Sequence, residues 1–290
     1  MLVLRILIGV GLAYLVLLLL AWLFQDRLAF PAPRAKLPDP KRVGVEDGER
    51  VELVSADGTM LVGWYLAPKK LKPPPTSPTS RGLLWFYGNG ETVAAIWPIV
   101  REFQPPGTAV LVLDYPGYGG SGGRATEGAL YAAADAAYAA LAARPDVDPQ
   151  RIYVYGRSLG SAVATYTAAH HPVAGLILES PFTNAAAMAK YHYGLLPRFL
   201  LRLSLDNVAN VRRVSCPILL FHGDADRLVP TAMGMAVAAA ATGPVEVVLI
   251  HGAGHNDTYD VGGDRTAIRC GSSSAGRSPR SPPQARFGPA

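Results

Sequence analysis

Short apolar segments alternate with segments of helical character from residue 83 to residue 250, and this alternation restricts the fold more than any other feature. The apolar segments, which we expect to be strands, are 83–87, 109–113, 152–155, 173–178, 218–221 and 245–250. The segments expected to be helices are 92–103, 127–144, 159–171 and 232–241. Strands that are apolar along their whole length are typical of a sheet covered on both faces. The alternation therefore predicts an α/β fold with a doubly wound, mostly parallel sheet.

A hairpin is expected before this series. Residues 50–55 and 59–66 flank the pair Asp57-Gly58, which is typical of a tight turn between antiparallel strands. The residues that follow, 69–80, are rich in Pro, Ser and Thr, and this composition predicts an exposed loop.

The N-terminal segment has the composition of a membrane span. Residues 6–24 contain no charged side chain, and as a helix they would extend about 28 Å, close to the hydrocarbon thickness of a bilayer. Trp22 and Phe24 lie at the end of this segment, where aromatic rings favour the headgroup region. Residues 1–30 are therefore predicted to form a single-pass membrane anchor. A cleaved signal peptide is the alternative, although its apolar part is normally shorter.

The charges on the two sides of the span bear on its orientation. Arg5 precedes the span, whereas five basic residues follow it closely: Arg27, Arg34, Lys36, Lys41 and Arg42. The positive-inside rule favours a cytoplasmic location for the rest of the chain. The side of the membrane on which the domain lies stays open.

The rest of the chain divides into three parts. Residues 31–49 are rich in Pro and charge and predict a linker, and residues 50–263 predict the folded domain. Within the domain, the apolar and basic residues 184–207 are a candidate small cap. Residues 264–290 contain five Arg and one acidic residue and predict a disordered basic tail, while the preceding residues carry 22 basic and 21 acidic side chains. The net charge of +5 therefore comes mainly from the tail, and we expect no nucleic-acid partner.

Two serines lie in the pattern Gly-x-Ser-x-Gly. Ser158, in Gly156-Arg157-Ser158-Leu159-Gly160, lies between a predicted strand and a predicted helix, which is the arrangement of a nucleophile elbow. Ser121, in Gly119-Gly120-Ser121-Gly122-Gly123, lies in a glycine-rich segment that does not lead directly into a helix. We therefore expect Ser158 to be a nucleophile and the Ser121 segment to be a flexible turn.

A serine nucleophile needs a base and a carboxylate that orients the base. Two loops that follow predicted strands supply such residues: 222–230, with His222, Asp224 and Asp226, and 251–257, with His251 and His255. Because parallel strands end at the same edge of a sheet, both loops are expected to reach Ser158. Two Asp side chains in one turn are also typical of a helix cap.

These segments resemble the α/β-hydrolase superfamily, specifically the membrane-anchored "α/β hydrolase domain-containing" serine hydrolases, often described as serine aminopeptidase-like or dienelactone-hydrolase-like. The segments that carry the resemblance are 88–90, 114–119, 156–160, 179–182, 222–230 and 254–257. They occur in the expected order between residue 50 and about residue 260.

The resemblance implies a role for each residue of the site. Asp226 corresponds to the triad acid and His255 to the base that activates Ser158, while His222 and His251 are interpreted as structural. The backbone N–H groups of Asn89 and Leu159 correspond to an oxyanion hole. A two-step acyl-enzyme reaction at these residues requires no cofactor and no metal, and we expect neither.

The sequence departs from the relatives in two places. Tyr87 stands where the family usually has His, so the hydrogen bonding inside this loop is expected to differ. Relatives continue past the histidine into an amphipathic helix, whereas residues 264–290 show no helical period. A frameshift-like replacement and a disordered native tail both explain that composition.

The predicted function is hydrolysis of carboxylic esters or thioesters through an acyl-enzyme intermediate, on a small-molecule or lipid-like acyl substrate. Amide or peptide hydrolysis is an alternative, because the same triad serves it. A non-catalytic membrane protein that retains the fold is another. The two cysteines, Cys216 and Cys270, are too few for a disulfide-stapled scaffold or a cysteine-rich metal site.

Overall fold

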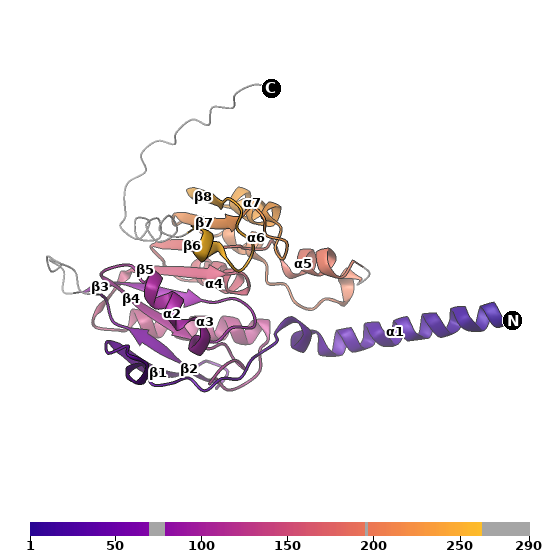
Figure 1. The fold of residues 1–290 in the computed structure, drawn as a ribbon, viewed down its shortest axis with the longest axis horizontal. Helices are drawn as coiled ribbons and strands as arrows, with labels where there is room; N and C mark the ends of the chain where they lie inside the picture. Colours follow the sequence, from indigo (N-terminus) through magenta and orange to yellow (C-terminus); the bar gives the residue numbers. More distant parts are fainter. Residues whose placement is uncertain (70–78, 195–196, 263–290) are drawn as a thin grey trace, which may run out of the picture.

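The computed structural model describes residues 1–69, 79–194 and 197–262, and its core is a single sheet (Figure 1). The strands are β1 (Gly48–Val54), β2 (Met60–Leu66), β3 (Ser80–Phe86), β4 (Thr108–Leu113), β5 (Val147–Arg157), β6 (Gly175–Glu179), β7 (Ile218–Gly223) and β8 (Val245–Ile250). Their order in the sheet is β1-β2-β4-β3-β5-β6-β7-β8. β2 pairs antiparallel with β1 and β4, and every other pairing is parallel. The predicted mostly parallel sheet is confirmed.

Helices follow most of the parallel strands. They are α1 (Leu2–Ala29), α2 (Val93–Phe103), α3 (Glu127–Ala142), α4 (Leu159–His170), α5 (Ala185–His192), α6 (Asn207–Val211), α7 (Thr231–Ala240) and α8 (Thr258–Gly262), with 3-10 turns η1 (Pro40–Val43) and η2 (Arg198–Leu200). The predicted helices agree with α2, α3, α4 and α7 to within two residues at each end. The short α6 and α8 were not predicted, because five residues are too few to show a helical period.

The two faces of the sheet are covered by different helices. α3, α4, α6 and α7 pack against one another along one face. A Cβ atom at Gly156 of β5 would lie 2.5 Å from the Ala164 side chain of α4, whereas the neighbouring Tyr155 contacts Tyr259 of α8. Since successive side chains of a strand point to opposite faces, α4 and α8 lie on opposite sides of β5.

The predicted hairpin is present and fixes the edge of the sheet. β1 and β2 pair in antiparallel register, with Gly48 opposite Leu66 and Val54 opposite Met60. The turn between them contains Gly58 with φ +80°, a conformation that glycine adopts without steric cost. The residues 70–78 of the predicted exposed loop lie outside the described residues.

The segment between α1 and β1, predicted to be a linker, packs closely against the domain. Phe30, Leu37 and Val45 are buried in the core. The backbone also contributes, since the carbonyl of Pro38 accepts a hydrogen bond from the Trp64 indole. A segment rich in Pro and charge is thus held in place by three widely spaced apolar side chains, which a compositional argument overlooks.

Helix α1 projects away from the domain, and its side chains are largely exposed (Figure 1). It has 28 residues with a mean hydropathy of 2.7 over its most apolar window, which is long and apolar enough to cross a membrane. A signal sequence near an N-terminus has the same properties. The predicted tail, 264–290, lies outside the described residues.

Candidate active site

Ser158 occupies a sharp turn between β5 and α4. It is the only residue between Arg157, where the strand ends, and Leu159, where the helix begins. Its backbone has φ 51° and ψ −115°, which is strained for a residue with a side chain. A Cβ at Gly160 would lie 2.1 Å from the carbonyl oxygen of Phe86. The glycine at this position therefore allows α4 to start directly beside β3, with Ser158 at the tip of the turn.

Ser158, His255 and Asp226 form one hydrogen-bonded chain. His255 Nε2 lies 3.0 Å from Ser158 Oγ, and His255 Nδ1 lies 2.7 Å from Asp226 Oδ2. The three residues follow the carboxyl ends of β5, β7 and β8, which lie at one edge of the sheet. The geometry is that of a nucleophile, a base and an orienting carboxylate.

Asp226 is held as an anion. Its side chain is fully buried, and Oδ1 accepts hydrogen bonds from the backbone N–H groups of Leu228 (2.9 Å) and Val229 (2.8 Å). Burial alone would raise its pKa, but hydrogen bonds from His222, His255 and the Val229 N–H outweigh it, so the pKa lies well below its usual value. An ionised Asp226 keeps the hydrogen of His255 on Nδ1 and leaves Nε2 free to accept a proton.

The second carboxylate of the same loop pairs with a different histidine. Asp224 Oδ2 lies 2.7 Å from Nδ1 of His251, whose side chain is 99% exposed. Asp224 also accepts a hydrogen bond from the N–H of Gly252 at 2.7 Å. This pair ties the loop after β7 to the loop after β8, and only the pair of Asp226 and His255 contacts Ser158.

His222 is fully buried beside Asp226. Its Nε2 lies 2.9 Å from the carbonyl oxygen of Val229 and 3.4 Å from Asp226 Oδ2. Because a carbonyl oxygen only accepts, Nε2 carries the hydrogen. His222 therefore fixes the backbone that follows Asp226 and places a second imidazole N–H, after that of His255, beside its carboxylate.

Ser121, the serine of the other Gly-x-Ser-x-Gly pattern, is completely buried, and its hydroxyl has a hydrogen-bond partner both as a donor and as an acceptor. Its hydroxyl donates to the carbonyl of Asp114 at 2.7 Å and accepts the N–H of Val62 at 2.9 Å. The surrounding backbone is equally tied, since the N–H of Gly122 donates to Met60 at 2.8 Å. The segment forms a turn, as predicted, but it is held in place and not free, because the hydroxyl joins β2 to the loop after β4.

Tyr87 organises the loop that precedes α2. Its hydroxyl donates to Asp114 Oδ1 and accepts the N–H of Tyr115, both at 3.1 Å. The Tyr115 hydroxyl returns a hydrogen bond to the Tyr87 carbonyl at 2.8 Å. These bonds are the altered internal hydrogen bonding that the sequence suggested at this position.

The side chain of Asn89 is held from two sides. Its Nδ2 donates to the carbonyl of Ala29 at 2.7 Å, at the end of α1, and its Oδ1 accepts from the Tyr118 hydroxyl at 2.6 Å. The other expected oxyanion donor, Leu159, is the first residue of α4, where backbone N–H groups have no partner within the helix.

Arg157 is a residue of the site that the sequence analysis did not single out. It lies beside Ser158 with a side chain only 9% exposed, and it contacts Glu91 (2.7 Å), the carbonyl of His255 (2.9 Å) and Asn256 (2.8 Å). Its Nε lies 3.3 Å from buried Glu179. Burial opposes the charge, but Glu179 and Glu91 together hold its pKa above its usual value. Nothing in the sequence indicates that Arg157 is buried and paired. Apart from the Gly-x-Ser-x-Gly pattern that contains it, this position carries no signal.

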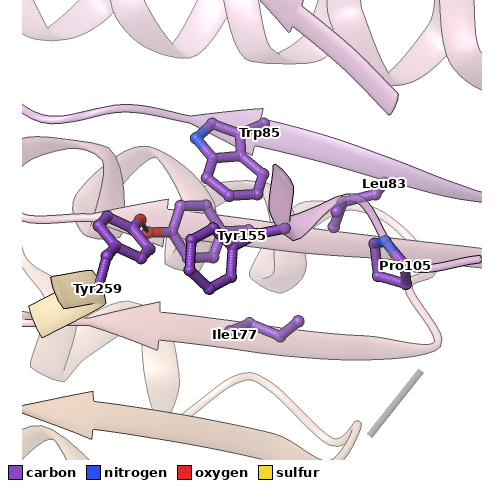
Figure 2. Close-up of a pocket in the computed structure, with 7 residues that line it drawn as sticks. Leu83, Trp85, Pro105, Tyr155, Ile177 and Tyr259 are labelled. Carbon is purple, nitrogen blue, oxygen red and sulfur yellow. Dashed lines mark hydrogen bonds between the residues drawn. The ribbon is translucent and has the colours of Figure 1, made fainter. Parts of the chain in front are cut away.

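A small apolar hollow lies under this network on the face of α2 and α8 (Figure 2). It is lined by Leu83, Trp85, Phe103, Pro105, Tyr155, Ile177 and Tyr259 and has room for about one water molecule. Figure 2 shows the hydroxyl of Tyr259 directed toward Tyr155, with which it forms a hydrogen bond. The hollow includes none of the three residues at the elbow edge and is too small for an acyl substrate.

The remaining histidines and potential ligands lie outside the chain of three residues. His171 pairs with Asp135 at 2.7 Å, His170 contacts the carbonyl of Tyr166, and His192 contacts the carbonyl of Leu228. Among the described residues, no group of three or more His, Cys, Asp or Glu is arranged to hold a metal ion. The expectation of no cofactor and no metal stays a prediction.

Comparison with known proteins supports the assignment of the fold. Residues 78–207 match the family described as "Serine aminopeptidase, S33". An uncharacterised protein of Mycobacterium tuberculosis is 36% identical over 81% of this chain and 82% of its own length. Alpha/beta hydrolase domain-containing protein 17B of Homo sapiens is 33% identical over 50% of this chain and 49% of its own length. Among solved structures, a Pyrococcus furiosus esterase, Pf2001, matches with a TM-score of 0.66 and 19% identity, covering 83% of this chain and 97% of the esterase.

The mostly parallel sheet and the sharp strand-to-helix turn at Ser158 are the architecture of an α/β hydrolase. The chain belongs to the α/β-hydrolase superfamily. The resemblance predicted from the sequence is therefore confirmed, and the family indicates hydrolysis as the reaction class.

Proposed function

We propose that this protein is a serine hydrolase that cleaves carboxylic esters or thioesters through an acyl-enzyme intermediate. The single observation that supports this most strongly is the chain Ser158 Oγ–His255 Nε2–His255 Nδ1–Asp226 Oδ2, with distances of 3.0 and 2.7 Å. The two contacts are within hydrogen-bond range before any substrate is bound.

In the first step, Ser158 Oγ attacks the carbonyl carbon of the substrate while His255 Nε2 takes the hydroxyl proton. The C–O or C–S bond then breaks, and His255 returns that proton to the leaving alcohol or thiol. Water repeats the sequence: it attacks the acyl-Ser158 carbonyl, gives a proton to His255, and releases the acid as Ser158 regains its proton. Asp226 stabilises the imidazolium in both steps, which its depressed pKa supports.

The oxyanion is held in this proposal by the backbone N–H groups of Leu159 and Asn89. Leu159 begins α4, so its N–H and the positive end of the helix dipole both favour the developing negative charge. The Asn89 side chain is already engaged by Ala29 and Tyr118, so only its backbone N–H is offered to substrate. Gly88, whose N–H donates to Glu91 at 2.7 Å, braces the same turn.

The substrate class rests on two features outside the triad. Helix α1 is long and apolar enough to anchor the protein in a membrane, and the residues after β6 include exposed aromatic side chains such as Tyr193 and Phe199. We propose that α1 is an uncleaved single-pass anchor and that the acyl donor is lipid-like. The anchor is tested by extraction: membrane-bound protein of full-length mass should resist alkaline carbonate, and release by carbonate would contradict it.

The reaction is tested with purified protein and p-nitrophenyl esters of graded chain length, matched thioesters and matched anilides. The proposal expects ester and thioester hydrolysis to exceed anilide hydrolysis and to vanish in Ser158→Ala. Faster anilide hydrolysis would favour the amidase alternative. Absence of turnover and of reaction with a fluorophosphonate in the folded protein would favour the non-catalytic alternative.

A further inference from the structure

The residues that follow β6 have the composition of a membrane-interface surface, and the chemistry proposed above does not use them. We name residues 185–194 and 197–205 the insertion segment. From 185 to 205 the sequence contains three Lys or Arg and no Asp or Glu. Tyr191, Tyr193 and Phe199 are 52%, 63% and 85% exposed. Basic side chains interspersed with exposed aromatic rings are typical of segments that lie at the headgroup level of a bilayer.

Contacts with the last turns of α1 hold the insertion segment beside the end of that helix, and so define its depth relative to a membrane that α1 crosses. Gln25 accepts the N–H of Arg202 at 2.7 Å and donates to the carbonyl of Leu200 at 3.4 Å. The guanidinium of Arg202 lies 5.1 Å from the centroid of the Trp22 ring and 3.6 Å from Asp26. If residues 6–24 fill the hydrocarbon layer, these partners lie in the adjacent headgroup layer, and the insertion segment lies there with them.

The same segment borders the Ser158 site. The Tyr191 hydroxyl and the His192 ring contact the carbonyls of Arg227 and Leu228, directly after Asp226. The other side of the site reaches α1 through the hydrogen bond from Asn89 to Ala29. Figure 1 shows α1 and α5 leaving the domain on the same side. The end of α1, the insertion segment and the Asp226 loop therefore adjoin one another around one edge of the sheet.

We propose that the insertion segment and the end of α1 form a surface that rests in the headgroup layer of the membrane carrying α1. The partner is the lipid bilayer itself, with anionic headgroups complementary to Lys190 and Arg202. The Ser158 site then opens toward the bilayer, and its substrates are acyl groups carried by molecules that reside there. The choice of substrate rests on the hydrolase function proposed above, but the position of the surface does not.

Depth is measured on the full-length chain in vesicles of phosphatidylcholine with one-fifth phosphatidylglycerol, after Cys216→Ser and Cys270→Ser. A fluorophore is attached at Tyr193→Cys, at Phe199→Cys, or at Gln150→Cys, an exposed position near the opposite, amino-terminal end of β5. Lipids with a nitroxide at the headgroup should quench the first two probes and leave the probe at residue 150 unquenched. Equal quenching at all three positions, or none at 193 and 199, would overturn the proposal, as would recovery of a membrane-free protein lacking α1.

Substrate access is measured separately. The double variant Tyr193→Ser, Phe199→Ser should lose about tenfold in hydrolysis of a long-chain ester embedded in the vesicles, because two aromatic contacts with the interface are removed. Its hydrolysis of soluble p-nitrophenyl acetate should match that of wild type. Val43→Ser serves as the control, because it also replaces an exposed apolar side chain with serine but lies in η1, outside the insertion segment. If the double variant hydrolysed both the embedded and the soluble ester as fast as wild type, bilayer access would be contradicted. The depth measurement does not depend on turnover.

A different observation, the position of Arg157, carries a second inference. The guanidinium joins three loops: it pairs with Glu91 in the loop before α2, it donates to the carbonyl of His255, and it belongs to the elbow itself. Glu91 in turn accepts the N–H of Gly88. We infer that Arg157 is a positioning residue that sets the distance between Ser158, His255 and the Asn89 turn, and this too rests on the proposed function.

Glu91→Gln tests this role with less disturbance than the loss of Arg157, because Glu91 is partly exposed and the amide retains an acceptor. We expect kcat for a soluble ester to fall about 10- to 100-fold with little change in KM, since small displacements of reacting groups affect the chemical step. Arg101→Gln breaks a comparable partly exposed pair with Asp47, 2.8 Å long and outside these three loops, and should leave kcat unchanged. A kcat for Glu91→Gln equal to that of wild type, with a lowered Tm, would make the role merely structural. Wild-type turnover of the same ester, measured alongside, tests the proposed function separately.

Discussion

The two Gly-x-Ser-x-Gly turns share a sequence pattern and differ in what they do with the hydroxyl. At the first, Ser121 is buried, and its hydroxyl is hydrogen-bonded to the backbone of Asp114 and of Val62. At the second, Ser158 is only partly buried and its hydroxyl contacts an imidazole. The pattern permits a sharp turn, and the element that follows decides the outcome. A helix starts at Leu159, whereas the chain after Ser121 continues as a loop to α3.

The glycines of the two turns also serve different purposes. Gly156 and Gly160 let α4 approach β3 and β5 without a Cβ between them. Gly119 instead has φ +46°, and a Cβ there would lie 1.9 Å from the Asp114 carboxylate, which donors from Val93 and Gly120 also surround. One turn is therefore built around a helix start and the other around a buried carboxylate.

The largest expected effect is on turnover at the Ser158 turn. Ser158→Ala should lower kcat for p-nitrophenyl esters at least about 10⁴-fold, because loss of the nucleophile removes the acyl-enzyme route. His255→Ala should lose a similar amount, since the two residues act as one unit. Steady-state kinetics with circular dichroism as a check on folding measure this. More than a tenth of wild-type kcat in folded Ser158→Ala would contradict the distinction between the turns.

The next effect is a difference in kcat between variants of the two Asp–His pairs. The pair Asp226–His255 contacts Ser158, whereas the pair Asp224–His251 joins two loops. Asp226→Asn should lower kcat about 10³- to 10⁴-fold, because an amide no longer fixes the His255 tautomer. Asp224→Asn should change kcat by less than about threefold, since its partner His251 is almost fully exposed and solvent weakens such a pair. Comparable losses in the two variants would show that the pairing at Asp226 has no special role.

Much of this arrangement could be predicted from local sequence. Strand and helix periods gave the sheet, and the strand-to-helix context selected Ser158 over Ser121. What could not be predicted depends on residues far apart in the chain. The burial of Phe30 and Leu37, the ion pair of Arg157 with Glu91, and the capture of the Ser121 hydroxyl by Val62 all require the sheet order to be known.

A third prediction concerns the stability of each turn. Gly160→Ala should destabilise the domain by about 3 kcal/mol or more, because the new methyl group would meet the Phe86 carbonyl at 2.1 Å and backbone must shift. Gly122→Ala, at the residue directly after Ser121, should cost within about 1 kcal/mol, since the nearest neighbour of the new Cβ would be 3.5 Å away. Urea unfolding of both variants measures the difference. Equal midpoints would show that the elbow does not depend on close approach of α4.

The smallest effect is a difference in the pH dependence of stability between two carboxylates: Asp226, which pairs with the His255 of the Ser158 site, and Asp114, which lies at the Ser121 turn. Hydrogen bonds hold the pKa of Asp226 below its usual value, so its stabilisation is present above about pH 4 and is lost as the pH falls through its folded pKa. Burial raises the pKa of Asp114, so its contribution is present at low pH and is lost as the pH rises through its folded pKa. The Tm difference between wild type and Asp226→Asn should therefore grow from pH 3 to pH 6, and that between wild type and Asp114→Asn should shrink. Parallel changes would contradict the opposite signs.

The most direct test of the central claim is covalent. Wild type, Ser158→Ala and Ser121→Ala are treated with a fluorophosphonate, digested, and mapped by mass spectrometry. The account predicts a label on Ser158 in wild type, the same label in folded Ser121→Ala despite a lower Tm, and none in Ser158→Ala. A label on Ser121, or undiminished labelling of Ser158→Ala, would contradict it.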